Sequence, residues 1–406
     1  MDQNKNKITQ VKEAILTAPE NSSLKDIVDS DKKAFNGIRM LYSTNAAGAQ
    51  LQIDESLEHL FTGVFSKKRL LAYSDSIRTE MEEGTSVICF KQRALFDTNL
   101  LSDLPKYFKG AEFSTRKKVE KVIEAVSEVY GGGFDYSFPM LENLREFTCA
   151  NNPYPVAKVS AAIYFDNKLR GNLTSSSNQD DLFAPYIEQA ESVWMSYRSN
   201  QHTWNMIDRR DLIYAVMLKT FQLCWTTNNI TIEIALNNLI EYCLNELGVL
   251  PLKELYFAWK AVIGFSVGYF TPVFDEKLLK SPKSKSVDRI GALAWDLFIF
   301  RFTETLLTEE KENNFYIPSV TTLDKGLLST IVSCPAKAMI SFPDLKYVET
   351  IFEDELQFQQ CLNSSMSAKQ RDRITDPNRG IKGSKRLRHY MSVSIANLEK
   401  SINRLV

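Results

Sequence analysis

Two segments of this sequence place an aspartate where an extended apolar run gives way to a helical one. The first, RALFDTNLLSDL, carries Asp97, and the second, TTLDKGLL, carries Asp324. In an open parallel sheet the carboxyl ends of neighbouring strands line a ligand crevice, so two such aspartates can converge although they are distant in sequence. Small, hard cations prefer carboxylate oxygens. The pair therefore indicates a metal site, with the ordinary alternative that Asp97 only caps the following helix.

The segment SFPMLENLREF supplies two further acidic candidates. Glu142 and Glu146 are four residues apart, so they lie on one face of the helix that this segment predicts. Either glutamate could complete a metal site. The alternative is an ordinary solvent-facing position, which is where most helical glutamates lie.

An acidic residue also interrupts the apolar helical segment RIGALAWDLFIF. Asp296 stands there between Trp295 and Leu297. A charge in such a place is costly to bury unless it binds a cation or forms a salt bridge, for which an arginine in the same segment would serve. Asp288, at the head of the same predicted helix, is either an N-cap or an alternative ligand.

The elements that must position these acids follow from the spacing of apolar residues. TSVICFKQRALF and NNFYIPSVTT have the β-branched and aromatic content of strands, and helical spacing dominates elsewhere. We expect an α/β fold in which helices flank a parallel sheet, with a large all-helical insertion. The predicted parts are a helical N-terminal region (1–85), the first half of the α/β core (86–150), the helical insertion (151–285), the second half of the core (286–345) and C-terminal helices with a basic arm (346–406).

In this order, FDTNLLSDL, FPMLENLREF, ALAWDLFIF and TTLDKGL resemble the motifs of the PIN domain, a metal-dependent nuclease fold. The resemblance covers about half of the chain, near 85–150 and 285–345. It implies a parallel sheet that gathers three or four acids around Mg²⁺ or Mn²⁺. The residues that match the acidic ligands are Asp97, Glu142 (or Glu146), Asp296 (or Asp288) and Asp324. The long helical stretch between the second and third acids departs from the compact pattern of the family.

The resemblance also implies roles for residues beside the aspartates. Thr98 and Asn99 match polar residues that would steady Asp97 or a metal-bound water, and Lys325 is placed to contact a phosphate as a point charge. A metal held by Asp97 and Asp324 would bind the scissile phosphate and lower the pKa of the attacking water. The expected activity is hydrolysis of nucleic acid. RNA is favoured over DNA, since most family members cut RNA.

Composition restricts the remaining possibilities. The 406 residues carry a net charge of −1, so any attraction to nucleic acid must come from a local basic surface. Six scattered cysteines without a CxxC pair and three isolated histidines argue against a zinc site. The N-terminal segment MDQNKNKITQ has no secretory signal core, and no apolar run is long enough to span a bilayer. We therefore expect a cytoplasmic protein without a membrane partner.

The segment from 364 onward is strongly basic and supplies candidate phosphate contacts. A solvated tail is the ordinary interpretation of such a run, and nucleic-acid binding is the second. The candidates are Lys369, Arg371, Arg373, Arg379, Lys382, Lys385, Arg386 and Arg388.

The long helical insertion is a natural docking surface, so we also expect a protein partner or a homo-oligomer. A toxin-like nuclease, an RNA-processing enzyme and a defence effector would all share the predicted site. The alternative from another class is a non-catalytic helical interaction or regulatory protein. The distance between Asp97 and Asp324 discriminates between these hypotheses, because carboxylates that are far apart cannot share a cation.

Overall fold

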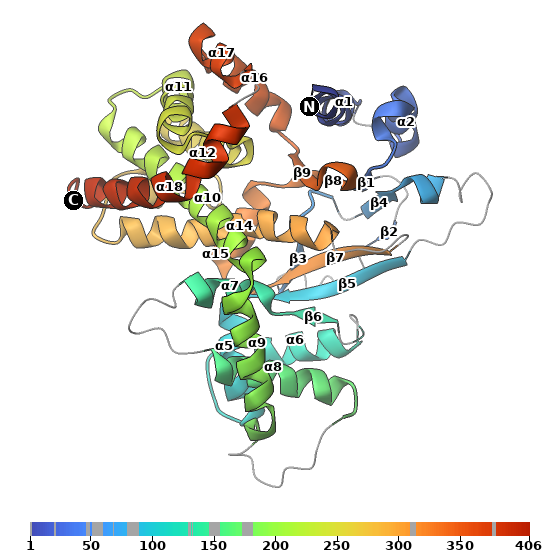
Figure 1. Cartoon of the computed structure of the whole chain (residues 1–406). Helices are drawn as coiled ribbons and strands as arrows, with labels where there is room; N and C mark the ends of the chain where they lie inside the picture. Colours follow the sequence, from blue (N-terminus) through green and yellow to red (C-terminus); the bar gives the residue numbers. More distant parts are fainter. Residues whose placement is uncertain are drawn as a thin grey trace. The chain divides into compact units, whose positions relative to one another are not determined.

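The computed structural model of this α/β protein describes residues 2–19, 22–45, 49–50, 60–67, 69–78, 89–128, 131, 133–145, 155–172, 182–308, 314–375 and 379–406. The chain forms two compact units that alternate along the sequence (Figure 1). The first unit comprises Met1–Ile207, Phe300–Leu328 and Ala336–Ile351. The second unit comprises Asp208–Ile299, Ser329–Pro335 and Phe352–Val406.

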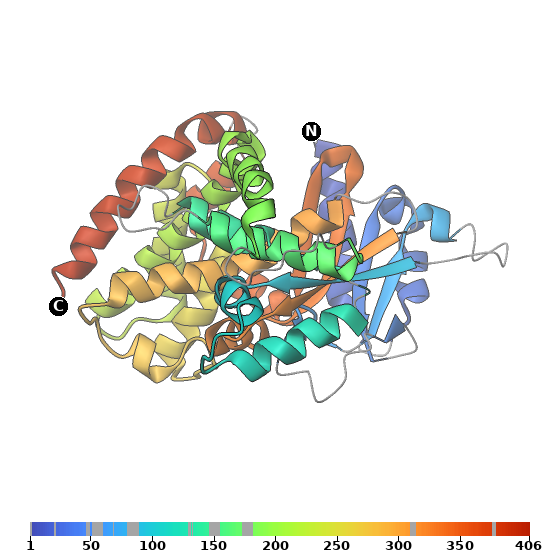
Figure 2. The ribbon, with the colours of Figure 1, turned by 90° about the horizontal axis from the view of Figure 1, so that it is seen from below.

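Two β-sheets form in the described strands, and the larger one is sheet A. Its order is β2–β4–β1–β8–β9, and β1 pairs antiparallel with both β4 and β8. Helices α1, α2 and α3, blue in Figure 2, pack their apolar side chains on this sheet. The bounds are α1 (Asp2–Thr17), α2 (Leu24–Ser30), α3 (Lys32–Phe35), β1 (Arg39–Thr44), β2 (Ala49–Gln50), β4 (Arg69–Tyr73), β8 (Ala336–Phe342) and β9 (Tyr347–Phe352).

Sheet A corrects two predictions. Residues 1–85 are not a purely helical region, because β1, β2 and β4 lie within them. The α/β core is not a single parallel sheet either, because the pairings of β1 and β2 are antiparallel. Both errors have one cause: RMLYST and RLLAY are short, they pair with each other, and RMLYST also pairs with β8, which is distant in the sequence. Local periodicity carries no signal of such a pairing.

Sheet B contains the two strands predicted to end on the aspartates. Its order is β3–β7–β5–β6, with β3 (Phe61–Gly63), β7 (Asn314–Thr321), β5 (Cys89–Phe96) and β6 (Phe134–Asp135). β5 pairs parallel with β6 and β7, and the register sets Phe96 opposite Thr321. β3 pairs antiparallel with β7. The expected parallel arrangement is thus limited to β6, β5 and β7.

Three helices cover one face of sheet B (Figure 1). They are α5 (Thr98–Phe108), α6 (Arg116–Glu128) and α8 (Val156–Leu169). In α6, Val119, Val122, Ile123 and Val126 recur at helical spacing and form its buried face, while lysines and glutamates occupy the exposed one. The adjoining helices of this unit are α7 (Ser137–Arg145) and α9 (Ile187–Ser199).

The described elements of the second unit are helices joined by loops, apart from Phe352 at the end of β9. Near its C-terminus, α18 packs beside the π-helical turn η4, where the hydroxyls of Tyr242 and Ser394 lie 2.8 Å apart. No described helix of the chain is both long and apolar enough to cross a membrane. The remaining helices, some of them shared with the first unit, are α10 (Gln201–Thr226), α11 (Ile232–Tyr242), η4 (Cys243–Leu247), α12 (Leu252–Val267), α13 (Glu276–Leu279), α14 (Ser286–Thr308), α15 (Lys325–Ser333), α16 (Glu355–Ser365), α17 (Ala368–Thr375) and α18 (Arg379–Asn403).

Candidate functional site

The parallel pairing of β5 and β7 brings the two predicted aspartates to the same edge of sheet B. The ladder continues one residue past the strands, where the backbone N–H of Asp97 donates to the carbonyl of Thr321 at 3.1 Å. Asp324 follows β7 by three residues and directly precedes α15. The carboxyl ends of parallel strands are where ligands bind in α/β sheets. This edge is therefore the candidate site.

Asp97 is buried at this edge, with only 5% of its surface exposed. Its Oδ1 accepts a hydrogen bond from the Leu100 backbone N–H at 2.6 Å, which makes Asp97 the N-cap of α5. Its Oδ2 accepts from the Thr322 hydroxyl at 2.5 Å and from the Leu323 backbone N–H at 3.3 Å. The capping role is thus confirmed. It leaves Oδ2 directed at the residues that follow β7.

The environment of Asp97 changes its acidity. Burial is the largest effect and raises the pKa of the carboxyl to about 6. Hydrogen bonds from Thr322, Leu100 and Leu323 oppose this rise, because they stabilise the charged form. The nearby charge of Asp324 adds to the rise. Asp97 therefore lies within the electrostatic range of Asp324.

Thr322 links the two aspartates. Its hydroxyl donates to Asp97 and accepts a hydrogen bond from the Asp324 backbone N–H at 2.8 Å. Thr322 itself is only 1% exposed. The sequence analysis did not single out this residue. The available signal was the pair of threonines directly before LDKG, since a strand that ends on hydroxyls can orient a nearby carboxylate.

Asp324 differs from Asp97 in being exposed to solvent. Its Oδ1 accepts a hydrogen bond from the Gly326 backbone N–H at 2.7 Å, which holds the side chain at the start of α15. Lys325 is exposed beside it, and Asn99 is exposed on the first turn of α5. The site thus combines one buried and one solvent-facing carboxylate.

Glu142 approaches the site from α7, which packs against both α5 and β5. Its Oε2 accepts a hydrogen bond from the hydroxyl of Thr98, the residue after Asp97. Thr98 was expected to steady Asp97, and the structure pairs it with Glu142 instead. The reason is that both oxygens of Asp97 already have donors from other residues.

None of the remaining acidic candidates is among the described residues of the first unit. Glu146 lies outside the described residues. Asp288 and Asp296 lie on α14 within the second unit, where Asp288 is exposed in the first turn and Asp296 is half-buried. Of the predicted ligands, the first unit therefore contains Asp97, Glu142 and Asp324.

The predicted basic arm corresponds to α17 and the beginning of α18. Two of its arginines bind the second unit itself. Arg371 donates to the carbonyl of Asn363 at 2.8 Å, and Arg373 donates to Oδ1 of Asn245 at 2.7 Å and to the carbonyl of Leu244 at 3.0 Å. Lys369 is exposed on α17. The other candidates, Arg379, Lys382, Lys385, Arg386 and Arg388, lie on α18.

The donor set at the edge of sheet B can be compared with the needs of a cation. Among the described residues, no group of three or more His, Cys, Asp or Glu side chains is arranged to hold a metal. The predicted cage of three or four acids is therefore not formed there. Mg²⁺, however, commonly uses one or two carboxylates together with waters and substrate phosphates. Asp97 and Asp324 would supply oxygen ligands to a site of that kind.

Comparisons of the chain with protein-family models, with curated proteins and with solved structures find no match. The PIN-domain resemblance consequently stays a prediction from short motifs. The chemistry at the edge of sheet B is the basis for assigning a function.

Proposed function

We propose that this protein is a nuclease that hydrolyses phosphodiester bonds with Mg²⁺ or Mn²⁺ at the carboxyl edge of sheet B, with RNA favoured over DNA. The observation that carries the proposal is the link that Thr322 makes between Asp97 and Asp324. A buried carboxylate and an exposed one meet there at the ends of two parallel strands. Hard divalent cations prefer such oxygen ligands.

Each residue of the site has a part in this proposal. Asp97 and Asp324 would hold the cation, which when bound would polarise a phosphate and lower the pKa of the attacking water. Thr322 keeps Oδ2 of Asp97 turned toward Asp324 and favours its charged form. Glu142, held by Thr98, is placed to orient a water or to act as a further ligand. Lys325 supplies a positive charge beside Asp324.

The same proposal includes the assignment of the first unit to a PIN-like fold. The parallel strands β6, β5 and β7, with α5, α6 and α8 on one face, support a PIN-like core in the first unit. In that assignment Asp296 would be the remaining acidic ligand, with Asp288 as the alternative. We propose this fourth position on the resemblance of ALAWDLFIF alone.

The decisive experiment is a cleavage assay on single-stranded RNA and DNA with Mn²⁺. We expect wild-type protein to cleave, and Asp97→Asn and Asp324→Asn each to lower the rate more than about 100-fold, beyond the loss typical of outer-shell partners. Asp275→Asn is the matched control, because Asp275 caps α13 through the Leu278 backbone N–H at 2.7 Å in the second unit. Equal rates in all four proteins, or no cleavage by wild type of any substrate offered, would contradict the proposal.

A non-catalytic interaction role is the second candidate, and one observation favours it. In the second unit, Val267 and Tyr269 are 66% and 67% exposed at the end of α12, and Phe270 is also exposed. Consecutive exposed apolar side chains of this kind often mark a protein contact. In that case Asp97→Asn would change stability, and no cleavage would be measured for any variant.

A further inference from the structure

A short stretch of the helices that cover sheet B carries an excess of positive charge. Between residues 105 and 121, at the end of α5 and the start of α6, six lysines and arginines stand against two glutamates. The whole chain carries a net charge of −1, so this excess is local. Lys168 and Arg170, near the end of α8, add two further cations. We call this region of α5, α6 and α8 the cationic face.

Aromatic rings fix several of these cations in place. Cations within about 6 Å of a ring centroid are attracted by the ring, and four such pairs occur on the cationic face. They are Lys106 with Phe113 at 5.7 Å, Lys109 with Phe183 at 5.7 Å, Arg116 with Tyr107 at 5.4 Å and Lys168 with Phe108 at 5.6 Å. The rings in turn pack on the core of sheet B. The positions of these cations are therefore stabilised by rings that belong to the packed core.

Most of these cations have no carboxylate of their own. Lys106 pairs with Asp103 at 2.7 Å, and Arg170 with Asp166 at 3.0 Å. Arg116 lies 3.8 Å from Glu112. By contrast, no ion pair within the described residues involves Lys109, Lys117, Lys118, Lys121 or Lys168, and all five are exposed. Solvent-facing lysines without a carboxylate partner are suited to a ligand that carries many negative charges.

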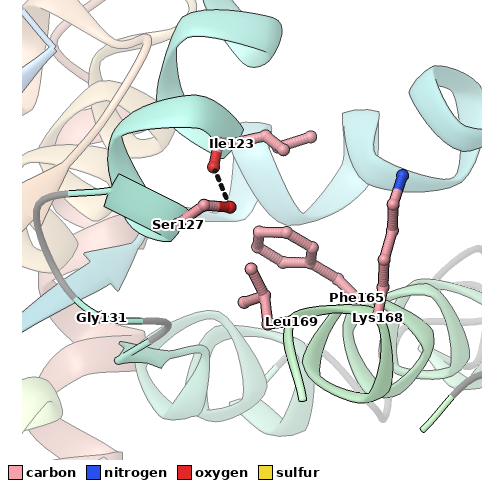
Figure 3. Close-up of a pocket in the computed structure, with 6 residues that line it drawn as sticks. All are labelled: Ile123, Ser127, Gly131, Phe165, Lys168 and Leu169. Atoms are coloured by element: carbon pink, nitrogen blue, oxygen red, sulfur yellow. Dashed lines mark hydrogen bonds between the residues drawn. The ribbon is translucent and has the colours of Figure 1, made fainter. Parts of the chain in front are cut away.

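A hollow of about 460 Å³ opens between α6 and α8 beside Lys168. In Figure 3 the ring of Phe165 and the side chain of Leu169 reach from α8 toward Ile123 and Ser127 on α6. Its size is within the range of small-ligand sites, and its lining combines apolar groups with a hydroxyl and an amine. A flat, partly polar group with a phosphate attached would match this lining, with Lys168 beside the phosphate.

The cationic face is connected to the candidate site through α5. Asp97 caps the first turn of α5, and the helix ends 11 residues later at Phe108. At 1.5 Å per residue this separation is about 16 Å. A stacked single strand covers that distance with about five nucleotides at roughly 3.4 Å each. Single-strand binding sites commonly span about 4–16 nucleotides, so one strand can occupy both regions.

We propose that the cationic face binds single-stranded nucleic acid, with the lysines on its phosphates and one base in the hollow between α6 and α8. The binding itself is independent of catalysis. Only the inference that the bound strand extends along α5 to Asp97 rests on the proposed nuclease function. The predicted basic arm lies in the second unit and is not needed for this contact.

The first test measures binding without cleavage, in EDTA, to a labelled oligonucleotide of about 16 nucleotides. The variant Lys109→Glu, Lys117→Glu, Lys118→Glu, Lys121→Glu removes four exposed lysines. Its matched control, Lys277→Glu, Lys280→Glu, Lys283→Glu, Lys285→Glu, makes the same charge change at exposed lysines of the second unit. We expect the first variant to bind at least about 10-fold more weakly. The slope of the logarithm of its binding constant against the logarithm of the salt concentration should be smaller by about 3, since each single-strand phosphate contact contributes about 0.7 to that slope.

The second test addresses the hollow. Ser127→Trp would fill it and leave every lysine in place, so we expect binding to weaken about 10-fold, by the loss of one stacked base, with an unchanged salt dependence. Ser199→Trp is the control, because Ser199 is likewise exposed and bonded to its own helix near the end of α9. Equal effects of the two tryptophans would overturn the base site.

The outcomes separate this inference from the nuclease proposal. Equal losses in both lysine variants, or none in either, would overturn the binding surface, as would binding of wild type to phosphatidylserine vesicles but not to the oligonucleotide. If wild type binds through the cationic face and never cleaves, the surface stands and the nuclease proposal fails. If wild type cleaves and the lysine variant binds normally, the nuclease proposal stands and the binding surface fails.

Discussion

The hydroxyl of Thr322 lies 2.5 Å from Oδ2 of Asp97, although the two residues are 225 positions apart in the sequence. The same hydroxyl accepts the backbone N–H of Asp324 at 2.8 Å. One buried side chain therefore sets the direction of a buried carboxylate and the position of an exposed one. The geometry of the proposed site depends on Thr322 more directly than on any other residue that is not itself acidic.

Replacing Thr322 by valine should damage the site without changing its shape. Valine keeps the volume but removes the donor to Asp97 and the acceptor for Asp324. We expect cleavage to fall about 10–100-fold, as for other partners that orient ligands. We also expect the free energy of unfolding at pH 8 to fall by about 1–3 kcal/mol, because buried polar groups lose their partners. Cleavage rates and urea denaturation measure the two effects.

Thr322→Ser is the control for this prediction, since serine retains the hydroxyl. It should stay within a few-fold of wild type in cleavage, with a small loss of stability from the missing methyl group. If valine and serine behave alike, the hydroxyl does not orient Asp97, and the link between the two aspartates has no functional meaning.

The raised pKa of Asp97 makes a prediction about stability and pH. The carboxyl has a pKa of about 6 in the folded protein, against about 3.9 in an unfolded chain. The folded state therefore binds the proton more tightly. The corresponding stabilisation is complete below about pH 3.9 and is lost as the pH rises through about 6. Between those limits the change is about 3 kcal/mol.

This stabilisation can be isolated by comparing wild type with Asp97→Asn, whose side chain does not titrate. The free energy of unfolding of wild type, relative to that of the variant, should fall as the pH is raised from about 4 to about 7. Urea denaturation across that range measures the difference. A constant difference would mean that Asp97 titrates normally and is not held in the buried setting described above.

The stabilisation by a bound metal should increase with pH, whereas the stabilisation by the proton on Asp97 decreases. A cation binds the charged carboxylate, so it competes with the proton on Asp97. We expect Mn²⁺ to raise the midpoint of thermal unfolding clearly at pH 7.5 and little at pH 5, with the change centred near pH 6. Asp97→Asn should lose this response at every pH. A stabilisation by Mn²⁺ that survives in Asp97→Asn would locate the cation elsewhere.

The sequence was informative where local pattern and chemistry coincide. FDTN and LDKG each combine the end of a strand with a helix start, so the convergence of Asp97 and Asp324 could be predicted from parallel-strand geometry. The strands of sheet A could not, because they are short and their pairing is distant in sequence. Thr322 was missed for a related reason. Its role depends on a hydrogen bond between residues that follow two different strands, and the periodicity of the sequence does not reveal such a bond.

Charge distribution was the hardest property to infer. The basic arm was predicted from its density of lysines and arginines, yet Arg371 and Arg373 bind carbonyls of their own unit. The cationic face assembles from three helices, and its aromatic supports include Phe183, which no linear motif connects to Lys109. A surface made by tertiary packing has no signature in a sequence window.

The last prediction concerns the second unit, where Asp354 accepts two strong hydrogen bonds. The Tyr256 hydroxyl and the Lys260 amine each lie 2.6 Å from one of its oxygens, and the Lys260 side chain is only 11% exposed. Burial raises the pKa of Tyr256 well above its usual value, so its hydroxyl stays protonated and remains a donor. Asp354→Ala would leave a nearly buried ammonium and a buried hydroxyl without an acceptor.

We expect Asp354→Ala to lower the free energy of unfolding by about 2–4 kcal/mol, because a buried charge loses its counter-ion. Tyr256→Phe removes only one neutral donor and should cost about 1 kcal/mol. Urea denaturation measures both. At denaturant concentrations below the unfolding midpoint of the variant, cleavage should remain as in wild type, since Asp97, Glu142 and Asp324 lie in the first unit and Asp354 lies in the second. A loss of cleavage in folded Asp354→Ala would instead make the second unit part of the reaction centre.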